Sequence, residues 1–311
     1  MLNNKSIGLL VVTRNEENNV RKCLEPVLKS EIIDKILVID SSSDDSTPQI
    51  VKNLGVDIFT INTEQFNHGA TRELGRTKLA TDIVIMLTAD AFALDSTTFY
   101  NLVKPIAENN SAVTYARQIP QDGADIFESF PRQYNYGLDM QVRTWRDIKI
   151  YGVFTFFCSN SCAAYDNKLL SSIGGFKTVL TNEDYLAAFD LLKAGNKITY
   201  VPDAIVKHSH SYTLSMEFKR YFDTGYIRSL YPEIQKVTGN AENRGISFTL
   251  QFFKHILHYH WYYLPYAIII TITKWLGFRF GFYGKIFPLA MIKKMSLYKF
   301  YWESQYYNNV N

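Results

Sequence analysis

Short apolar runs alternate with longer amphipathic segments in the N-terminal part of the chain. The runs are rich in β-branched residues, which is typical of strands buried on both faces of a parallel sheet. Strands are expected over Ile7–Thr13, Lys35–Asp40, residues 56–61 and Ile83–Thr88, with helices between them up to about residue 29, over 48–55 and over about 70–80. This β-α-β-α-β-α-β order predicts an α/β fold with a Rossmann-like, mostly parallel sheet flanked by helices.

Polar side chains follow the expected strands where those strands end. Thr13, Asn15 and Glu16 mark the end of the first, Asp40 that of the second, and Asp90 follows the fourth. Ligands of open α/β sheets bind at the carboxyl ends of strands, although Asp40 is equally explained by a helix-capping turn. The sequence contains neither a Gly-rich dinucleotide fingerprint nor a P-loop signature. These patterns favour a nucleotide held by carboxylates and a metal ion.

Asp90 follows a wholly apolar run and is well placed to hold a hard cation at a diphosphate. The alternative is an N-cap for a helix expected from about Asp95. A further strand is expected over residues 197–210, where His208 and His210 would point to the same face. Neutral imidazole is a common metal ligand, so with Asp90 a mixed metal site is possible. A surface position or a pH-sensitive patch is the alternative for the two histidines.

Glu183 and Asp184 directly precede the amphipathic segment 185–195. Acids in a first helical turn are favoured by the helix dipole, which is the structural explanation. One carboxylate could instead be a general base that takes a proton from an acceptor hydroxyl. Arginine side chains are candidates for diphosphate or acceptor contacts, with solvated helix positions as the alternative. The arginines considered are Arg72, Arg117, Arg132 and Arg220, and Arg72 is favoured because it lies just inside an expected helix.

The order of these motifs resembles that of family 2 glycosyltransferases of the GT-A fold over roughly residues 5–225. VVTRNEE resembles the opening strand and loop of that family, and VIDSSSDDST its nucleotide loop. LTADA stands where the DxD metal motif falls, with Thr88 in place of the first Asp, so only Asp90 is carried over. GGF followed by NED resembles the acceptor-side motif, and His208 matches a third metal ligand found in part of the family.

Longer stretches, among them FNHGATRELG, YARQIP and FCSNSCAAY, resemble bacterial rhamnosyltransferases that build O-antigen or capsular polysaccharide. The resemblance implies dTDP-L-rhamnose as donor and a lipid-linked or polysaccharide acceptor, with no nucleic-acid partner. A UDP-hexose or UDP-galactofuranose transferase is the alternative within the same fold. A catalytically inactive, membrane-bound sugar-binding protein is the alternative of another class. A nucleotidyltransferase is disfavoured because TRNEENN lacks the Gly-rich signature that such enzymes carry after the first strand.

The resemblance also implies a role for each site residue. The nucleotide-sugar group is Thr13, Asn15, Glu16, Asp40, Arg72 and Asp90, with Asp40 and Arg72 at the thymine or uracil base. Asp90 and His208 are implied to bind Mg²⁺ or Mn²⁺ at the diphosphate. Asp184 is the implied catalytic base and Glu183 its neighbour. The implied reaction inverts C1 of the sugar, because the acceptor oxygen attacks opposite the leaving diphosphate.

The chain from Gly245 onward is basic and rich in aromatic residues. It holds seven Lys and Arg residues against one acid, whereas residues 1–244 carry a net charge of −3. An anionic membrane surface attracts such a segment. The uncharged run 262–273 is too short to cross about 30 Å of hydrocarbon. We therefore expect residues 241–311 to form a helical, membrane-associating extension that lies on or re-enters the bilayer, with a spanning helix or a soluble helical cap as alternatives.

Domain division and location follow from the same features. We expect a catalytic domain over residues 1–240, with the boundary in the polar stretch 238–245. Cys23, Cys158 and Cys162 form no even disulfide framework, and no secretory leader is recognised. A cytoplasmic protein, peripheral at the inner face of the cell membrane, is expected.

Overall fold

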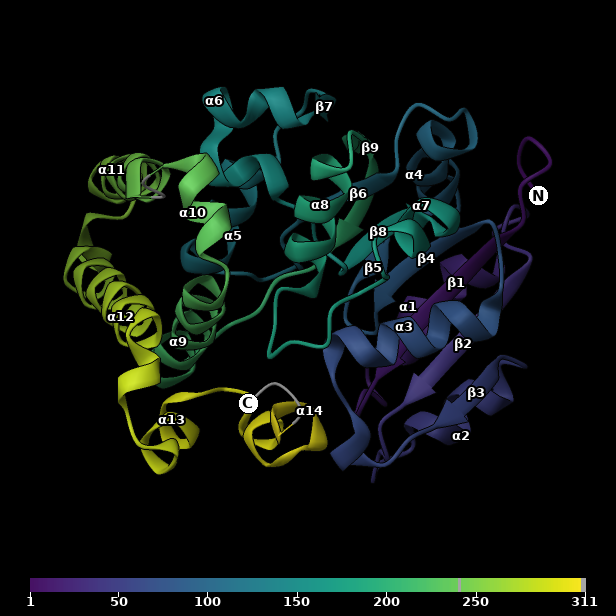
Figure 1. Ribbon diagram of the computed structural model, residues 1–311, viewed down its shortest axis with the longest axis horizontal. Coiled ribbons are helices and arrows are strands. Elements are labelled where there is room, and N and C mark those ends of the chain that lie inside the picture. Colours follow the sequence, from purple (N-terminus) through teal and green to yellow (C-terminus); the bar gives the residue numbers. More distant parts are fainter. Residues whose placement is uncertain (240–241, 309–311) are drawn as a thin grey trace. The chain divides into compact units, whose positions relative to one another are not determined.

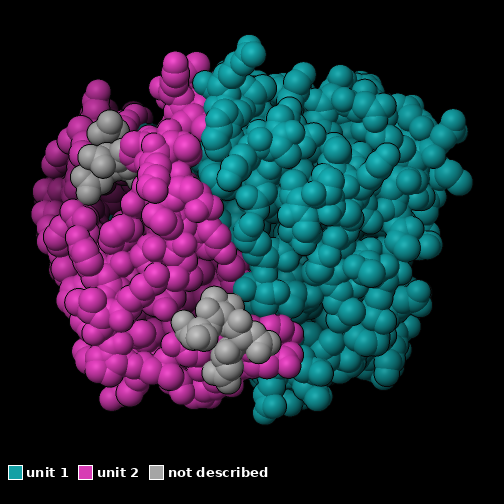
Figure 2. Space-filling view, viewed as in Figure 1, with its two compact units in different colours: residues 1–146, 155–178, 183–210 teal, residues 147–154, 179–182, 211–311 magenta. Residues whose placement is uncertain are grey.

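The computed structural model describes residues 1–239 and 242–308. The chain divides into two compact units, coloured separately in Figure 2. Unit 1 comprises residues 1–146, 155–178 and 183–210, and unit 2 comprises residues 147–154, 179–182 and 211–311. The domain boundary expected within 238–245 stays a prediction: residues 240 and 241 lie outside the described residues, and the two units divide at other positions.

The first half of the sheet in unit 1 is parallel, as the alternating sequence pattern predicts. Its strands are β1 (Ile7–Thr13), β2 (Lys35–Asp40), β3 (Asp57–Thr60) and β4 (Ile83–Thr88), and the connecting helices are α1 (Val20–Leu28), α2 (Thr47–Asn53) and α3 (His68–Leu79) (Figure 1). β1 lies between β2 and β4, and all three pairs, β3 with β2 included, are parallel. Every side chain of β1 except Val12 is buried, because the strand has helices on both faces.

Beyond β4 the sheet also contains antiparallel strands, so it is mixed, although most of its strands run in one direction. β8 (Cys162–Asp166) runs antiparallel to both β4 and β6 (Val113–Ile119). β9 (Ile198–Lys207) is parallel to β6 and antiparallel to the short strands β5 (Phe92–Ala93) and β7 (Gln141–Arg143). The remaining helices of unit 1 are α4 (Thr97–Ala107), α5 (Ile126–Asn135), α7 (Asn167–Ser172) and α8 (Glu183–Lys193). The insertion of β8 places the end of β9 on the same sheet as β4.

Three parallel strands end at one edge of this sheet. Thr13 is in register with Asp40 at the ends of β1 and β2, and Val12 with Thr88 at the end of β4. The segments that follow these strands carry the polar residues singled out in the sequence. The fold therefore gathers them at the carboxyl edge, where open α/β sheets bind their ligands.

Unit 2 is helical, as predicted for the tail, and its first long helix begins at Leu214. Its helices are α6 (Ile148–Tyr151), α9 (Leu214–Leu230), α10 (Pro232–Thr238), α11 (Glu242–Tyr259), α12 (Leu264–Phe282), α13 (Leu289–Met295) and α14 (Gln305–Asn308). α12 packs along α9 through glycines: a Cβ on Gly277 or Gly281 would lie 2.4 or 1.9 Å from a backbone oxygen of α9. In the described residues, no helix combines the length and apolarity needed to cross a membrane.

Candidate active site

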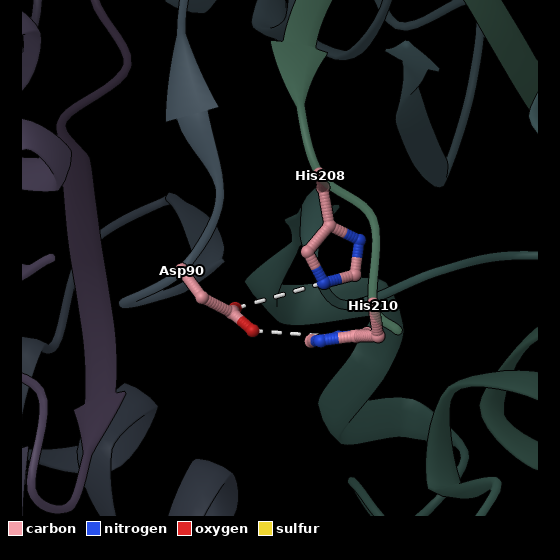
Figure 3. Close-up of side chains that lie close together, drawn as sticks. All are labelled: Asp90, His208 and His210. Carbon is pink, nitrogen blue, oxygen red and sulfur yellow. Dashed lines mark ion pairs between the residues drawn. The ribbon is translucent and has the colours of Figure 1, made fainter. Parts of the chain in front are cut away.

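Asp90, His208 and His210 converge just beyond the ends of β4 and β9. Both imidazoles point toward the carboxylate, as Figure 3 shows. The Nε2 atom of His208 lies 3.6 Å from one carboxylate oxygen of Asp90, and that of His210 lies 3.3 Å from the other. One potential ligand atom from each residue lies within 4.8 Å of the others. This arrangement is a candidate metal site with one carboxylate and two imidazoles.

The helix-cap alternative for Asp90 does not account for its position. Asp95, rather than Asp90, caps α4, because its carboxylate accepts the backbone N–H groups of Thr97 and Thr98 at 2.9 and 3.2 Å. β9 ends at Lys207, so the strand expected to reach residue 210 is shorter than predicted. The histidines instead lie in the segment that follows the strand, and from this segment both rings point toward the carboxylate of Asp90.

The carboxylate of Asp90 is held in its ionised form. Burial favours a higher pKa, but the hydrogen bond to His208 and the charges of His208 and His210 outweigh burial and hold the pKa of Asp90 well below its usual range. An ionised carboxylate beside imidazole nitrogens is the state that a divalent cation requires of its ligands.

A chain of hydrogen bonds orients His208. Its Nδ1 lies 3.0 Å from the side-chain oxygen of Gln118 on β6, and the amide nitrogen of Gln118 donates to the hydroxyl of Ser159 at 2.8 Å. A carbonyl acceptor at Nδ1 keeps a ring proton there, so Nε2, which faces Asp90, is the nitrogen that can give up its proton and bind a cation. Arg132 adds a hydrogen bond from Nε to the backbone oxygen of His208 at 2.7 Å. The ring is therefore positioned as a metal ligand before any ion binds.

Glu183 lies in a buried ion pair at the start of α8. Its Oε1 is 2.9 Å from Nη1 of Arg72 on α3 and accepts a hydrogen bond from the side-chain amide of Asn160 at 3.0 Å. Burial opposes its charge, but Arg72, then His68, and the amide of Asn160 lower the pKa of Glu183. Glu183 is therefore the acid of the pair that stays ionised.

The surroundings of Asp184 raise its pKa, whereas those of Glu183 lower the pKa of Glu183. Its two carboxylate oxygens accept the backbone N–H groups of Asn160 at 3.1 Å and of Tyr185 at 2.8 Å. Burial raises the pKa of Asp184 to about 7, and the neighbouring charge of Glu183 adds to the rise. Two adjacent carboxylates with pKa values driven apart are the usual arrangement of a general base beside a charged neighbour. Both acids lie in the first helical turn, as the helix-dipole explanation expects, but their partners go beyond that role.

The nucleotide-side residues form a second group at the ends of β1 and β2. Asp40 is buried, and its carboxylate accepts the backbone N–H of Ser43 at 3.0 Å. The hydroxyl of Ser43 in turn accepts the backbone N–H of Asn15 at 2.8 Å. In the described part of the chain, the buried hydroxyls of Thr13 and Ser41 have no hydrogen-bond partner. Unsatisfied buried hydroxyls at this edge are suited to a polar ligand.

Three other predicted residues, Glu16, Arg72 and Arg220, are each hydrogen-bonded or ion-paired within the protein. Glu16 is half-buried near this group, and burial followed by the charges of Asp90 and Asp45 raises its pKa, against the hydrogen bond from Asn19 that lowers it. The guanidinium of Arg72 is engaged with Glu183, so its contact with a nucleotide base stays a prediction. In unit 2, Arg220 pairs with Glu217 at 2.8 Å.

Sequence reasoning missed the polar residues that join these groups. Gln118 and Ser159 connect to His208 of the candidate metal site, and Asn160, the next residue, contacts both Glu183 and Asp184. The only signal was the polar SNS stretch between two cysteines, which has no periodicity. Their hydrogen bonds depend on strand pairing between distant segments, so local sequence could not reveal them.

Comparisons with known proteins agree with this architecture. The family model described as glycosyl transferase family 2 matches residues 9–174. The O-antigen chain rhamnosyltransferase RfbN of Salmonella typhimurium is 35% identical over 308 residues, covering 97% of this chain and 98% of the relative. The O-antigen chain rhamnosyltransferase WbaN of Salmonella anatum is 34% identical over 278 residues, covering 88% of each chain.

Among solved structures, the mannosyltransferase PcManGT of Pyrobaculum calidifontis, in complex with GDP-Man and Mn²⁺, superimposes with a TM-score of 0.64. It is 16% identical, and the match covers 90% of this chain and 88% of the mannosyltransferase. At this identity the likeness shows the fold, a mixed α/β sheet with flanking helices as in GT-A enzymes. The extensive sequence match to the family model and to the two relatives goes further. The chain belongs to glycosyl transferase family 2 and is a glycosyltransferase.

Proposed function

We propose that this enzyme transfers L-rhamnose from dTDP-L-rhamnose to a hydroxyl group of a lipid-linked or polysaccharide acceptor during O-antigen or capsule synthesis. Both relatives described above are named O-antigen chain rhamnosyltransferases and match most of the chain. The observation that supports the proposal is that the cluster of Asp90, His208 and His210 is connected within unit 1 to the pair Glu183 and Asp184. His208 contacts Gln118, Gln118 donates to Ser159, and the next residue in the chain, Asn160, donates to both acids.

The proposed cofactor is Mn²⁺, bound by Asp90, His208 and His210. Imidazole and carboxylate together suit a first-row transition ion, whereas Mg²⁺ prefers a shell of oxygen ligands. His210 supplies a third protein ligand where Thr88 replaces the first carboxylate of the DxD motif. When bound, such a cation compensates the negative charge that develops on a leaving diphosphate.

Asp184 is the proposed general base. Its carboxylate takes the proton of the acceptor hydroxyl as that oxygen bonds to C1 of the sugar. The bond from C1 to the donor diphosphate breaks at the same time, and dTDP leaves. Attack from the opposite face inverts C1. Glu183 is neutralised by Arg72, which leaves Asp184 as the acid of this pair that can take up the proton.

The proposed nucleotide subsite is formed by Thr13, Asn15, Glu16 and Asp40, with Ser41 beside them. The two unpartnered buried hydroxyls of Thr13 and Ser41 are proposed to bind the ribose or the base. Asp40 is buried and fixed by Ser43, so it can accept the N3–H of a thymine without a change of rotamer. Such pre-organised acceptors lower the entropic cost of binding.

A panel of donors tests this function. Purified protein is heated with dTDP-L-rhamnose, UDP-hexoses or UDP-galactofuranose, with and without Mn²⁺, and the unfolding temperature is recorded. A ligand that binds only the folded state raises that temperature. The proposal expects the largest rise with dTDP-L-rhamnose and Mn²⁺ together, and slow Mn²⁺-dependent hydrolysis of the same donor. A larger rise with a UDP-sugar would identify the alternative donor, and a rise without hydrolysis of any donor would support the inactive, sugar-binding alternative.

We also propose that unit 2 holds the enzyme on the inner face of the cell membrane. One side of α12 carries exposed apolar residues three or four positions apart, here named the α12 apolar face: Ile268, Ile269, Ile272, Trp275, Leu276 and Phe280. The opposite side holds the glycines that pack on α9. α12 is thus apolar on its exposed side as well as its packed side, which is unusual for a helix facing water.

An anionic bilayer surface is the proposed occupant of the α12 apolar face. The exposed basic residues of unit 2 include Lys254, Lys285, Lys294 and Lys299, and the only acid after Gly245 is Glu303. Exposed aromatic rings at Trp261–Tyr263 precede the helix. Basic residues, interfacial aromatic rings and an apolar helix face together are typical of helices that lie in the plane of a membrane surface.

A further inference from the structure

Asn160 makes contacts with both acids of the proposed catalytic pair. Its side-chain nitrogen donates to Oε1 of Glu183 at 3.0 Å, and its backbone N–H donates to Oδ2 of Asp184 at 3.1 Å. Its side-chain oxygen accepts the hydroxyl of Tyr165 at 2.8 Å. The side chain is only 2% exposed. A single buried residue therefore connects with both carboxylates.

The amide of Asn160 is fixed in one orientation. A rotation by half a turn would place its oxygen against the carboxylate of Glu183 and its nitrogen against the hydroxyl of Tyr165, which would lose the Glu183 hydrogen bond. Tyr165 is itself fully buried on β8, and its hydroxyl lies 3.6 Å from the sulfur of Cys158. The backbone of Asn160 is thereby held where its N–H meets Asp184.

The same oxygen of Glu183 that contacts Asn160 is paired with Arg72. The amide thus adds a second donor that holds this carboxylate on the guanidinium. The charged and titratable groups that interact with Asp184 are Glu183 on α8, Arg72 on α3, Tyr136 after α5, Cys158, and Tyr165 on β8, and His68 on α3 interacts with Glu183. Of these, Glu183 supplies the largest electrostatic contribution that disfavours ionisation of Asp184.

We propose that Asn160 is a positioning residue for the transfer reaction: it holds the carboxylate of Glu183 on Arg72 and keeps Asp184 able to accept a proton near neutral pH. This inference rests on the proposed role of Asp184 as base. Without the amide, Glu183 loses a donor and can turn toward Asp184, and the backbone N–H that stabilises ionised Asp184 is no longer fixed. Both changes disfavour the ionised base.

The test is the pH dependence of kcat for sugar transfer by the full-length protein, in the presence of Mn²⁺. For Asn160→Ala we expect the acidic limb of the profile to move upward by about one pH unit. Then kcat is about fivefold lower near pH 7, about tenfold lower near pH 6, and recovers toward the wild-type value near pH 9. The KM for the donor should change less than about threefold, because Asn160 is not in the proposed nucleotide subsite.

Matched variants separate positioning from structural support. Tyr165→Phe removes only the hydroxyl that anchors the amide and should move the profile in the same direction by a smaller amount, which keeps the test available if Asn160→Ala fails to fold. Asn167→Ala is the control, because the side chain of Asn167 makes two part-buried hydrogen bonds in unit 1, with Arg76 and with the backbone of Thr81, both at 2.8 Å. It should lower the unfolding temperature without moving the profile.

The outcomes distinguish this inference from the proposed function. A loss of kcat that is equal at every pH in both Asn160→Ala and Tyr165→Phe, or an unmoved profile, would overturn the positioning role. Asp184→Asn is measured in parallel. If it retains wild-type turnover, the proposed base is wrong; if it is inactive while the Asn160 and Tyr165 profiles are unmoved, only the positioning role is wrong.

Discussion

Arg72 and Glu183 form an ion pair of 2.9 Å in which each side chain is only 6% exposed. The pair joins the start of α3 to the start of α8, and Glu183 is the immediate neighbour of Asp184. Taking two charges out of water is costly unless each has its partner. The ion pair therefore constrains both the stability of unit 1 and the electrostatic environment of the proposed base.

Removing one partner of this pair should destabilise the fold. Arg72→Met leaves Glu183 buried without its guanidinium, and we expect the free energy of unfolding to fall by roughly 3 to 5 kcal/mol. The double variant Arg72→Met with Glu183→Gln removes the uncompensated charge and should recover much of this loss. Urea unfolding followed by circular dichroism measures both. Additive losses in the double variant would mean that the two side chains are not energetically coupled.

Replacing the proposed base should abolish turnover and leave donor binding intact. For Asp184→Asn we expect kcat to fall by about 10² to 10⁴, the usual contribution of general-base catalysis, with an unchanged Kd for the donor. In the wild-type enzyme kcat should rise with pH through about 7, because Asp184 must lose its proton to act as base and burial raises its pKa to about 7. A flat wild-type profile from pH 5 to 8 would be incompatible with this role.

Gln118 should affect metal binding without touching the metal. Its side-chain oxygen lies 3.0 Å from Nδ1 of His208 and fixes the ring with Nε2 toward Asp90. Gln118→Leu should weaken Mn²⁺ binding by about 10- to 100-fold, as loss of such supporting hydrogen bonds does in other metal sites. Gln118→Glu keeps an acceptor at Nδ1 and should bind Mn²⁺ nearly normally. Equal affinities of wild type and Gln118→Leu in a calorimetric titration would show that the hydrogen bond between Gln118 and His208 does not support metal binding.

The α12 apolar face should determine binding to membranes. Wild-type protein is expected to sediment with vesicles that contain anionic lipid, and Ile269→Ser with Trp275→Ser should reduce the partition by at least about tenfold through lost apolar burial. The control is Leu138→Ser in unit 1, since Leu138 is 71% exposed and lies outside this face. Undiminished sedimentation of the double variant would exclude the α12 apolar face as the contact.

The sequence predicted the part of the fold that follows from local periodicity. β1 to β4 and their helices were foreseen because β-branched runs alternate with amphipathic segments, and Asp90 was singled out because an acid directly follows a buried strand. β8 was not, since its short Cys-Ala-Ala-Tyr-Asp segment has neither alternation nor β-branched residues. The mixed sheet beyond β4 follows from that strand, and pairing of distant segments has no local signal.

The sequence singled out the charged residues of the candidate site but not its neutral amides. Carboxylates and imidazoles beside strand ends carry a recognisable chemical signature, so Asp90 and His208 were identified. Asp184 was named from the family resemblance of its NED motif. Gln118 and Asn160 act through hydrogen bonds whose partners lie far away in the chain, and neutral amides are common in loops. Arg72 was assigned to a nucleotide base, but its ion pair with Glu183 depends on the packing of α3 against α8, which sequence spacing does not specify.

The central claim is that one divalent cation is shared by Asp90, His208, His210 and the donor diphosphate. Pulsed electron paramagnetic resonance of the full-length protein with bound Mn²⁺ and dTDP tests it directly. We predict nitrogen couplings from imidazole ligands and phosphorus couplings from the diphosphate on the same ion, with the nitrogen couplings lost in His208→Ala with His210→Ala. Phosphorus couplings alone, unchanged between wild type and that double variant, would contradict the claim.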